Sequence, residues 1–196
     1  MRTILFVVSL CFSCLASTAQ HSYKDSIQSF INQYRDTHEV INRDDRKKLS
    51  FFPVNEKYRV KAKFEKTTSN SWFLMPTSGT LKKTYRLYGV LHFKIDGAPL
   101  QLNVYQSQDL LQSEKYKDYL FLPFTDSTSG YESYHGGRYL DLTFDDIQGN
   151  EVVLDFNKAY NPYCAYVTGR YNCPIPPPDN HLHIAVKAGE MSYNKE

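Results

Sequence analysis

The sequence lacks the short motifs that identify the common catalytic folds. It has no Gly-x-Ser-x-Gly nucleophile elbow, no phosphate-binding loop and no glycine-rich dinucleotide fingerprint. It also lacks the spaced Cys and His pairs that form zinc sites. His181 and His183 lie two residues apart on an expected strand, and we interpret them as exposed strand residues. We therefore predict no cofactor and no metal site.

The sequence also has no large excess of positive or negative charge. The 23 Lys and Arg residues nearly balance the 21 Asp and Glu residues, which leaves a formal net charge of +2. Such a balance provides no electrostatic attraction to nucleic acid or to anionic lipid. We expect neither as a partner.

Long hydrophobic runs are absent beyond the first 15 residues. The run from Ile4 to Leu15 is too short to span a bilayer, which takes about 20 apolar residues. It follows Arg2 and precedes small residues at 17–19, as in a cleaved signal peptide. We predict that residues 1–19 are a signal peptide and that the mature chain begins at Gln20. The protein is then exported, to the periplasm or outside the cell, and has no transmembrane segment.

Residues 20–196 contain no internal repeat and no linker, so we predict a single domain. Aromatic residues make up 15% of the sequence, with 16 tyrosines, and aromatic side chains favour strands. Residues 24–41 carry apolar side chains at helical spacing and predict one amphipathic helix.

Beyond this helix the apolar residues alternate with polar ones, which indicates strands with one wet face. A turn signal, Asp96-Gly97, separates two of these strands. The expected strands are residues 58–65, 85–95, 100–104, 119–124, 138–144, 151–157 and 182–187. We predict a mainly β fold at the margin of α+β: an antiparallel barrel or sandwich of about seven or eight short strands, with the helix packed on one end.

A first polar segment follows the strand at 119–124. It carries Asp126 and Glu132, bends at Gly136-Gly137 and enters the next strand at Arg138. Paired glycines let backbone amides approach a bound group, and a guanidinium can clamp a carboxylate or a phosphate. The same residues also suit a β-bulge in which Arg138 pairs with Asp126 or Glu132 to fix the loop.

A second polar segment carries Asp155, Asn157 and Lys158 at the end of a strand. Residues 138–144 and 151–157 are expected to form a hairpin, which would place Asp141 near Asn157 and would bring the two polar segments together. The predicted binding residues are Asp126, Glu132, Arg138, Asp155, Asn157 and Lys158, walled by Tyr134, Tyr139 and Tyr160.

Four cysteines are present, and Cys11 and Cys14 belong to the predicted signal peptide. Cys164 and Cys173 are then the only thiols of the mature chain. In an exported protein they are expected to form a disulfide, although Cys164 could also serve as a nucleophile.

Several strings in the C-terminal half resemble one bacterial family. They are TSGYESYHGGRYLDL, LDFNKAYNPYCAY, CPIPPPDN and the AGE at 188–190. This part of the chain is similar to the family called domain of unknown function 1684, over roughly Phe52 to Glu190. The family has no established activity, so the resemblance implies a shared β-rich domain over 52–190 and no particular chemistry.

Three classes of function fit these residues. The first is a module that binds a small polar or anionic ligand, such as a sugar or a small acid, between the two polar segments. The second is a structural or interaction domain whose polar residues only fix loops. The third is a hydrolase with Glu132 and Asp155 as acid and base. The sequence favours a binding module over an enzyme and sets no oligomeric state.

Overall fold

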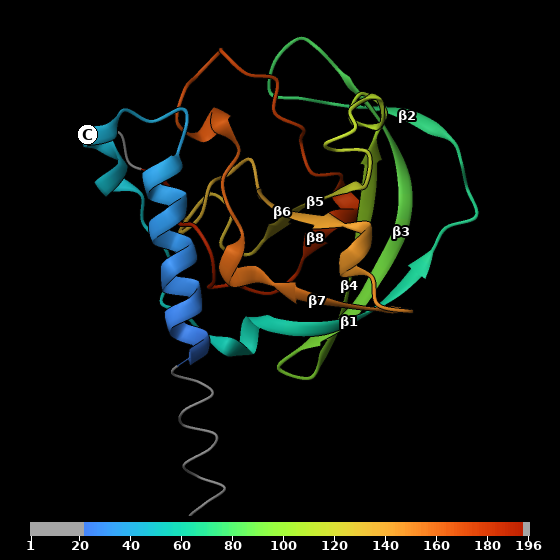
Figure 1. The fold of residues 1–196 in the computed structure, drawn as a ribbon, viewed down its shortest axis with the longest axis horizontal. Helices are drawn as coiled ribbons and strands as arrows, with labels where there is room; N and C mark the ends of the chain where they lie inside the picture. The colour runs from blue at the N-terminus through green and yellow to red at the C-terminus, as the bar shows by residue number, and fades with distance from the viewer. Residues whose placement is uncertain (1–21, 194–196) are drawn as a thin grey trace, which may run out of the picture.

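A computed structural model describes residues 22–193, and one curled sheet of eight strands dominates it (Figure 1). The strands are β1 (Arg59–Lys66), β2 (Trp72–Met75), β3 (Lys83–Ile95), β4 (Ala98–Ser107), β5 (Tyr119–Asp126), β6 (Arg138–Thr143), β7 (Glu151–Asp155) and β8 (His181–Leu182). One long helix, residues 22–37, precedes them. Short 3-10 turns lie at Arg43–Lys48, Glu56–Tyr58, Leu110–Gln112, Phe144–Asp146, Phe156–Lys158, Tyr163–Ala165 and Pro178–Asn180.

The mainly β fold with one N-terminal helix is confirmed. In the described part of the chain no helix has the length and apolar character needed to cross a membrane.

The strands follow the order β6-β5-β4-β3-β1-β7, and each neighbouring pair is antiparallel. β2 pairs with the first part of β3, and β8 adds a short parallel pairing to β5. The sheet curls into a half-barrel, so its outer strands approach each other. Tyr139 of β6 forms an isolated bridge with Tyr160, just beyond the end of β7.

The main core lies on one face of this sheet. Alternation along the strands directs every second side chain to that face, so that apolar rows from neighbouring strands pack together. Its solvent-excluded members include Leu91, Leu102, Leu120, Leu122 and Leu154. Burying each such side chain stabilises the fold by about 1.5–3 kcal/mol. A smaller, tyrosine-rich cluster contains Met75, Tyr85, Tyr105, Phe121 and Tyr139.

The N-terminal helix buries Ile27 and Ile31, as its amphipathic pattern predicts. The predicted extension to residue 41 is wrong, because the helix ends at residue 37. Nδ1 of His38 accepts hydrogen bonds from the backbone N–H groups of Val40 and Ile41, which turns the chain away from the helix axis. Ile41 instead joins a separate apolar cluster.

One predicted turn is confirmed and one strand was missed. Asp96 and Gly97 both adopt positive φ, as a tight hairpin turn between β3 and β4 requires. Strand β2 was not predicted because its burial does not alternate. Phe73 and Leu74 are neighbours along the chain and both are exposed.

The predicted hairpin of residues 138–144 and 151–157 is wrong. β6 pairs with β5 and β7 pairs with β1, so the two strands occupy opposite ends of the sheet order. A capping box turns the chain at the end of β6, since the Asp146 carboxylate accepts from the N–H and the hydroxyl of Thr143. This tight turn redirects the chain before a ladder between β6 and β7 can form.

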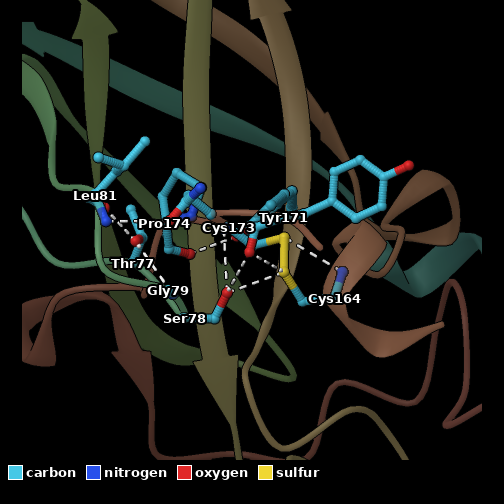
Figure 2. The surroundings of a disulfide bond; sticks show 10 residues. Thr77, Ser78, Gly79, Leu81, Cys164, Tyr171, Cys173 and Pro174 are labelled. Atoms are coloured by element: carbon cyan, nitrogen blue, oxygen red, sulfur yellow. Dashed lines mark hydrogen bonds between the residues drawn. A yellow bond between two sulfur atoms is a disulfide. The ribbon is translucent and has the colours of Figure 1, made fainter. Parts of the chain in front are cut away.

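The predicted disulfide is present between Cys164 and Cys173 (Figure 2). Ser78, in the connection between β2 and β3, donates its hydroxyl to the Cys164 sulfur and accepts from the N–H of Cys173. The backbone N–H of Ser78 donates to the Cys173 carbonyl at 2.9 Å. The disulfide loop is therefore joined to the β2–β3 connection, although the two segments are far apart in sequence.

The disulfide should stabilise the fold by restricting the unfolded chain. Replacing both Cys164 and Cys173 by Ser is expected to lower the free energy of unfolding by about 2–3 kcal/mol, the chain-entropy value for so short a loop. Denaturant unfolding measures this loss, with the Ser78→Ala variant as a control that keeps the crosslink. Unchanged stability of the double variant would contradict the structural role of the bond.

Candidate functional site

The six binding residues predicted from the sequence lie in several environments. Two of them, Asp126 and Arg138, form one buried pair. Asp155 and Asn157 belong to a network that reaches the N-terminal helix. Glu132 is half-buried and Lys158 is exposed.

The buried pair is placed by alternation along two neighbouring strands. Arg138 lies opposite Phe124 in the β5–β6 ladder, on the same face as the core residue Leu140. One guanidinium nitrogen donates to Oδ2 of Asp126, and Oδ1 of Asp126 accepts from the N–H and the hydroxyl of Thr128. Only 1% of Arg138 is exposed. A ligand in solution has no access to this guanidinium.

The C-terminal segment supplies further hydrogen-bond acceptors for Arg138. The guanidinium donates to the carbonyl oxygens of Val186, Ala188 and Glu190. The Arg138–Asp126 pair therefore joins the loop after β5 to the C-terminal segment, and Asp126 is one of the two partners expected for Arg138, although the β5–β6 register is regular and has no β-bulge. The strand predicted over residues 182–187 is wrong in extent, because β8 covers only His181–Leu182 and the chain beyond it keeps a single backbone bond to the end of β5, from the Ser127 N–H to the Ile184 carbonyl.

The bend before Arg138 needs one of the two glycines that the sequence places there. Gly137 has a φ of +83°, and an added Cβ would lie 2.6 Å from the carbonyl oxygen of Phe124. Gly136 has no positive φ. The glycine at 137 therefore serves close packing of two strands and not the approach of a ligand.

Asp155 and Asn157 hold the start of the N-terminal helix. The hydroxyl of Tyr23 donates to both carboxylate oxygens of Asp155, at 3.0 and 3.1 Å. Asn157 exchanges hydrogen bonds with the backbone of Asn55, and its amide also donates to Tyr23. Asn157 does not reach Asp141, contrary to the expectation from the hairpin.

The remaining predicted residues make surface contacts. Glu132 pairs with Lys187 at 2.9 Å, and both side chains are about half exposed. The ammonium of Lys158 lies over the ring of Phe30 on the helix. Tyr134, a predicted wall residue, packs beside Gly136 and His135.

A cavity of about 820 Å³ lies beside the tyrosine-rich cluster, between the helix, the outer strands and the disulfide loop. Four of the residues predicted as binding or wall residues line it: Tyr139, Asp155, Lys158 and Tyr160. Its lining also includes the tyrosines at 34, 85, 116, 119, 163 and 171. The size is that of a small-molecule site.

Asp141 is the acidic group that tyrosines orient in this cavity. It lies opposite Phe121 in the ladder, and the hydroxyls of Tyr119 and Tyr160 donate to its Oδ1 at 2.6 and 2.7 Å. No residue of the described chain donates to Oδ2, and the side chain is exposed to solvent within the cavity. Although the side chain meets solvent in the cavity, the surrounding rings remove part of its hydration and so raise the pKa of Asp141, against the opposing effect of both tyrosine hydrogen bonds.

A second carboxylate, Glu190, is fully buried behind the cavity. It accepts from the hydroxyls of Tyr166 and Tyr34 and from the backbone N–H of Asn161. Burial raises the pKa of Glu190 to about 7. Since Tyr34 lies on the N-terminal helix and lines the cavity, Glu190 joins the C-terminal segment to one cavity wall.

The comparison with protein families gives one match, which covers most of the chain. Residues 45–191 match the model of the family described as Protein of unknown function (DUF1684). The chain belongs to this family. The match includes the segment from Phe52 to Glu190 on which the resemblance was based, and it confirms that resemblance.

A solved structure of a protein with similar sequence supports the fold. The chain is 31% identical to an uncharacterized protein of Haloarcula marismortui whose solution structure was determined by NMR. The alignment has a TM-score of 0.64 and covers 89% of this chain and 96% of that one. Among curated proteins no match is found.

Asp141 and Tyr119 were not predicted as site residues. In β6, Tyr139 and Asp141 lie on the face opposite the core residues Leu140 and Leu142. A polar residue on that face is ordinary for a half-exposed strand. The available signal was the row of aromatic residues on the same face, which includes Tyr119 of the neighbouring strand.

The buried pair yields a stability prediction. Arg138→Met should lower the free energy of unfolding by about 3–5 kcal/mol, because it leaves the Asp126 carboxylate buried without its cation. Lys187→Met is the control, since it breaks a half-exposed pair with Glu132 and should cost at most about 1 kcal/mol. Equal effects of the two variants in denaturant unfolding would contradict the structural role of Arg138.

Glu190 yields a prediction of pH dependence. The folded protein holds the Glu190 proton up to a pKa of about 7, whereas the unfolded chain releases it near 4.5. Folding therefore takes up protons between these values, and the stability that this group contributes falls as the pH rises from about 4.5 to about 7.

Glu190→Gln removes this titration and keeps the size of the side chain. The free energy of unfolding of the wild type, relative to this variant, should decrease by about 1–3 kcal/mol across that window. Other titrating groups, Asp141 included, are present in both proteins and cancel. Chemical denaturation at several pH values measures the difference, and a constant difference would show that Glu190 titrates normally.

Proposed function

We propose that the protein binds a small polar molecule that carries hydrogen-bond donors, in the cavity around Asp141. The observation that carries the proposal is the geometry of this carboxylate. Tyr119 and Tyr160 both bond the same oxygen, Oδ1, which fixes the side chain and leaves Oδ2 available to a ligand. A preorganised acceptor in a roomy aromatic cavity is typical of a binding site.

The charge of the lining favours a donor-bearing ligand over a small acid. Three carboxylates and two ammonium groups line the cavity: Asp141, Asp146, Asp155, Lys83 and Lys158. No arginine lines it among the described residues. A carboxylate ligand beside Asp141 would face a like charge in a partly desolvated setting, where such repulsion is strong.

Hydrolysis by Glu132 and Asp155 receives no support from their contacts. Glu132 is bonded to Lys187 and does not line the cavity, whereas Asp155 lines it and is held by Tyr23. A carboxylate pair for acid–base work must flank one substrate bond. The binding proposal requires only Asp141 and its tyrosine partners.

Export remains part of the proposal. The signal peptide predicted at residues 1–19 lies outside the described residues. The Cys164–Cys173 disulfide supports export, because disulfides persist in oxidising compartments outside the cytoplasm. The ligand would then be met in the periplasm or in the medium.

Removing the charge of Asp141 should abolish most of the binding. Labelled protein is titrated by NMR with one probe at a time, among them glucose, choline and acetate. Donor-bearing probes should shift the amide signals around Tyr119, Asp141 and Tyr160. Acetate should not shift them. Asp141→Asn should weaken that binding by about 10- to 100-fold, the value of one hydrogen bond to a charged group.

The control is Asp145→Asn, which changes an exposed carboxylate outside the cavity lining. It should bind like the wild type. Acetate binding at the cavity, or equal affinity of the Asp141→Asn variant for every bound probe, would refute the proposal.

A further inference from the structure

We propose that the ligand is an organic cation with an alkylated ammonium group, held between tyrosine rings and the carboxylate of Asp141. This inference rests on the proposed function and names the ligand class of that site. Three features of the cavity carry it: the use of the tyrosine hydroxyls, the charge of the lining and an ammonium contact already present in its wall.

The tyrosine hydroxyls around the cavity are largely occupied by other residues. Those of Tyr119 and Tyr160 donate to Asp141, and that of Tyr34 donates to Glu190. The hydroxyl of Tyr139 donates to the carbonyl of Pro174, and that of Tyr163 to Glu39. What these tyrosines offer to a ligand is ring surface, whose negative face attracts a cation.

The charged groups of the lining point to the same ligand class. Carboxylates outnumber ammonium groups by three to two, and Asp141 presents an unbonded oxygen to the cavity. A sugar needs donors as well as acceptors from its site, and five of the eight tyrosine hydroxyls in the lining already donate to other residues of the protein. An alkylated ammonium group needs a counter-charge and ring faces, and Asp141 and the tyrosines of the lining offer both.

The wall of the cavity already contains the proposed contact. The ammonium of Lys158 lies 5.6 Å from the centre of the Phe30 ring, and both residues line the cavity. The contact shows that the aromatic lining of this cavity accommodates an ammonium group. For a ligand cation, the tyrosine rings away from Lys158 supply the aromatic surface and Asp141 supplies the counter-charge.

The test compares choline with 3,3-dimethylbutan-1-ol, its uncharged analogue of nearly the same shape, on the full mature chain. Isothermal titration and NMR mapping should show that choline binds at Tyr119, Asp141 and Tyr160 at least 10-fold more tightly than the alcohol. Because the two probes differ essentially in charge, the comparison is made on the wild type and does not depend on a variant that folds.

Two variants locate the effect. Asp141→Asn should reduce choline affinity at least 10-fold and the weaker affinity of the alcohol by a smaller factor, whereas Asp145→Asn should alter neither. Equal binding of choline and the alcohol would overturn the ligand class and leave the proposed site intact. Glucose binding at these residues without choline binding would do the same. Absence of any probe at the cavity would overturn both the ligand class and the proposed function.

Discussion

Arg138 carries a positive charge into the interior, and the C-terminal half of the chain is arranged around that charge. A buried guanidinium is stable only when acceptors surround it. Asp126 supplies the countercharge, and three carbonyl oxygens of residues 186–190 supply the remaining acceptors. The rings of Phe52 and Phe124 cover the guanidinium from other sides. The C-terminal segment thus follows a path set by a side chain and not by a strand ladder.

This path determines where the cavity wall lies. Gly189 has a φ of +75° and lies against the carbonyls of Phe156 and Ala159, where no larger residue fits. The chain then places Glu190 where it accepts from Tyr166 and from Tyr34 of the N-terminal helix. The helix is therefore tied to the segment that Arg138 holds. The polar residues of the two polar segments thus largely position the C-terminal segment and the N-terminal helix. The tyrosine-lined cavity beside β6 results from these positions.

Local sequence patterns predicted most of the secondary-structure elements but not which distant strands pair with each other. Alternation located most strands, Asp96-Gly97 marked a hairpin, and two remaining cysteines predicted one disulfide. The pairing of β7 with β1 joins residues far apart in sequence, so no local pattern contains it. The path of residues 186–190 depends likewise on hydrogen bonds from Arg138, which lies in a different strand.

The candidate site was missed for a related reason. The residues predicted to bind a ligand were polar residues near glycines and strand ends. Two of them, Arg138 and Asp126, are buried in the interior. Asp141 is a single carboxylate on an otherwise ordinary strand face. It becomes distinctive only because Tyr119 of β5 and Tyr160 beyond β7 converge on one of its oxygens. That convergence depends on the curl of the whole sheet.

The most direct measurement of the central claim is a 13C NMR titration of the Asp141 carboxyl group, with and without choline. Burial among tyrosine rings should place its pKa above the ordinary aspartate value of about 4. Bound choline should lower that pKa, because a cation stabilises the carboxylate. Titration of Asp141 in the ordinary range, unchanged by choline, would show a solvated surface carboxylate and would contradict the account.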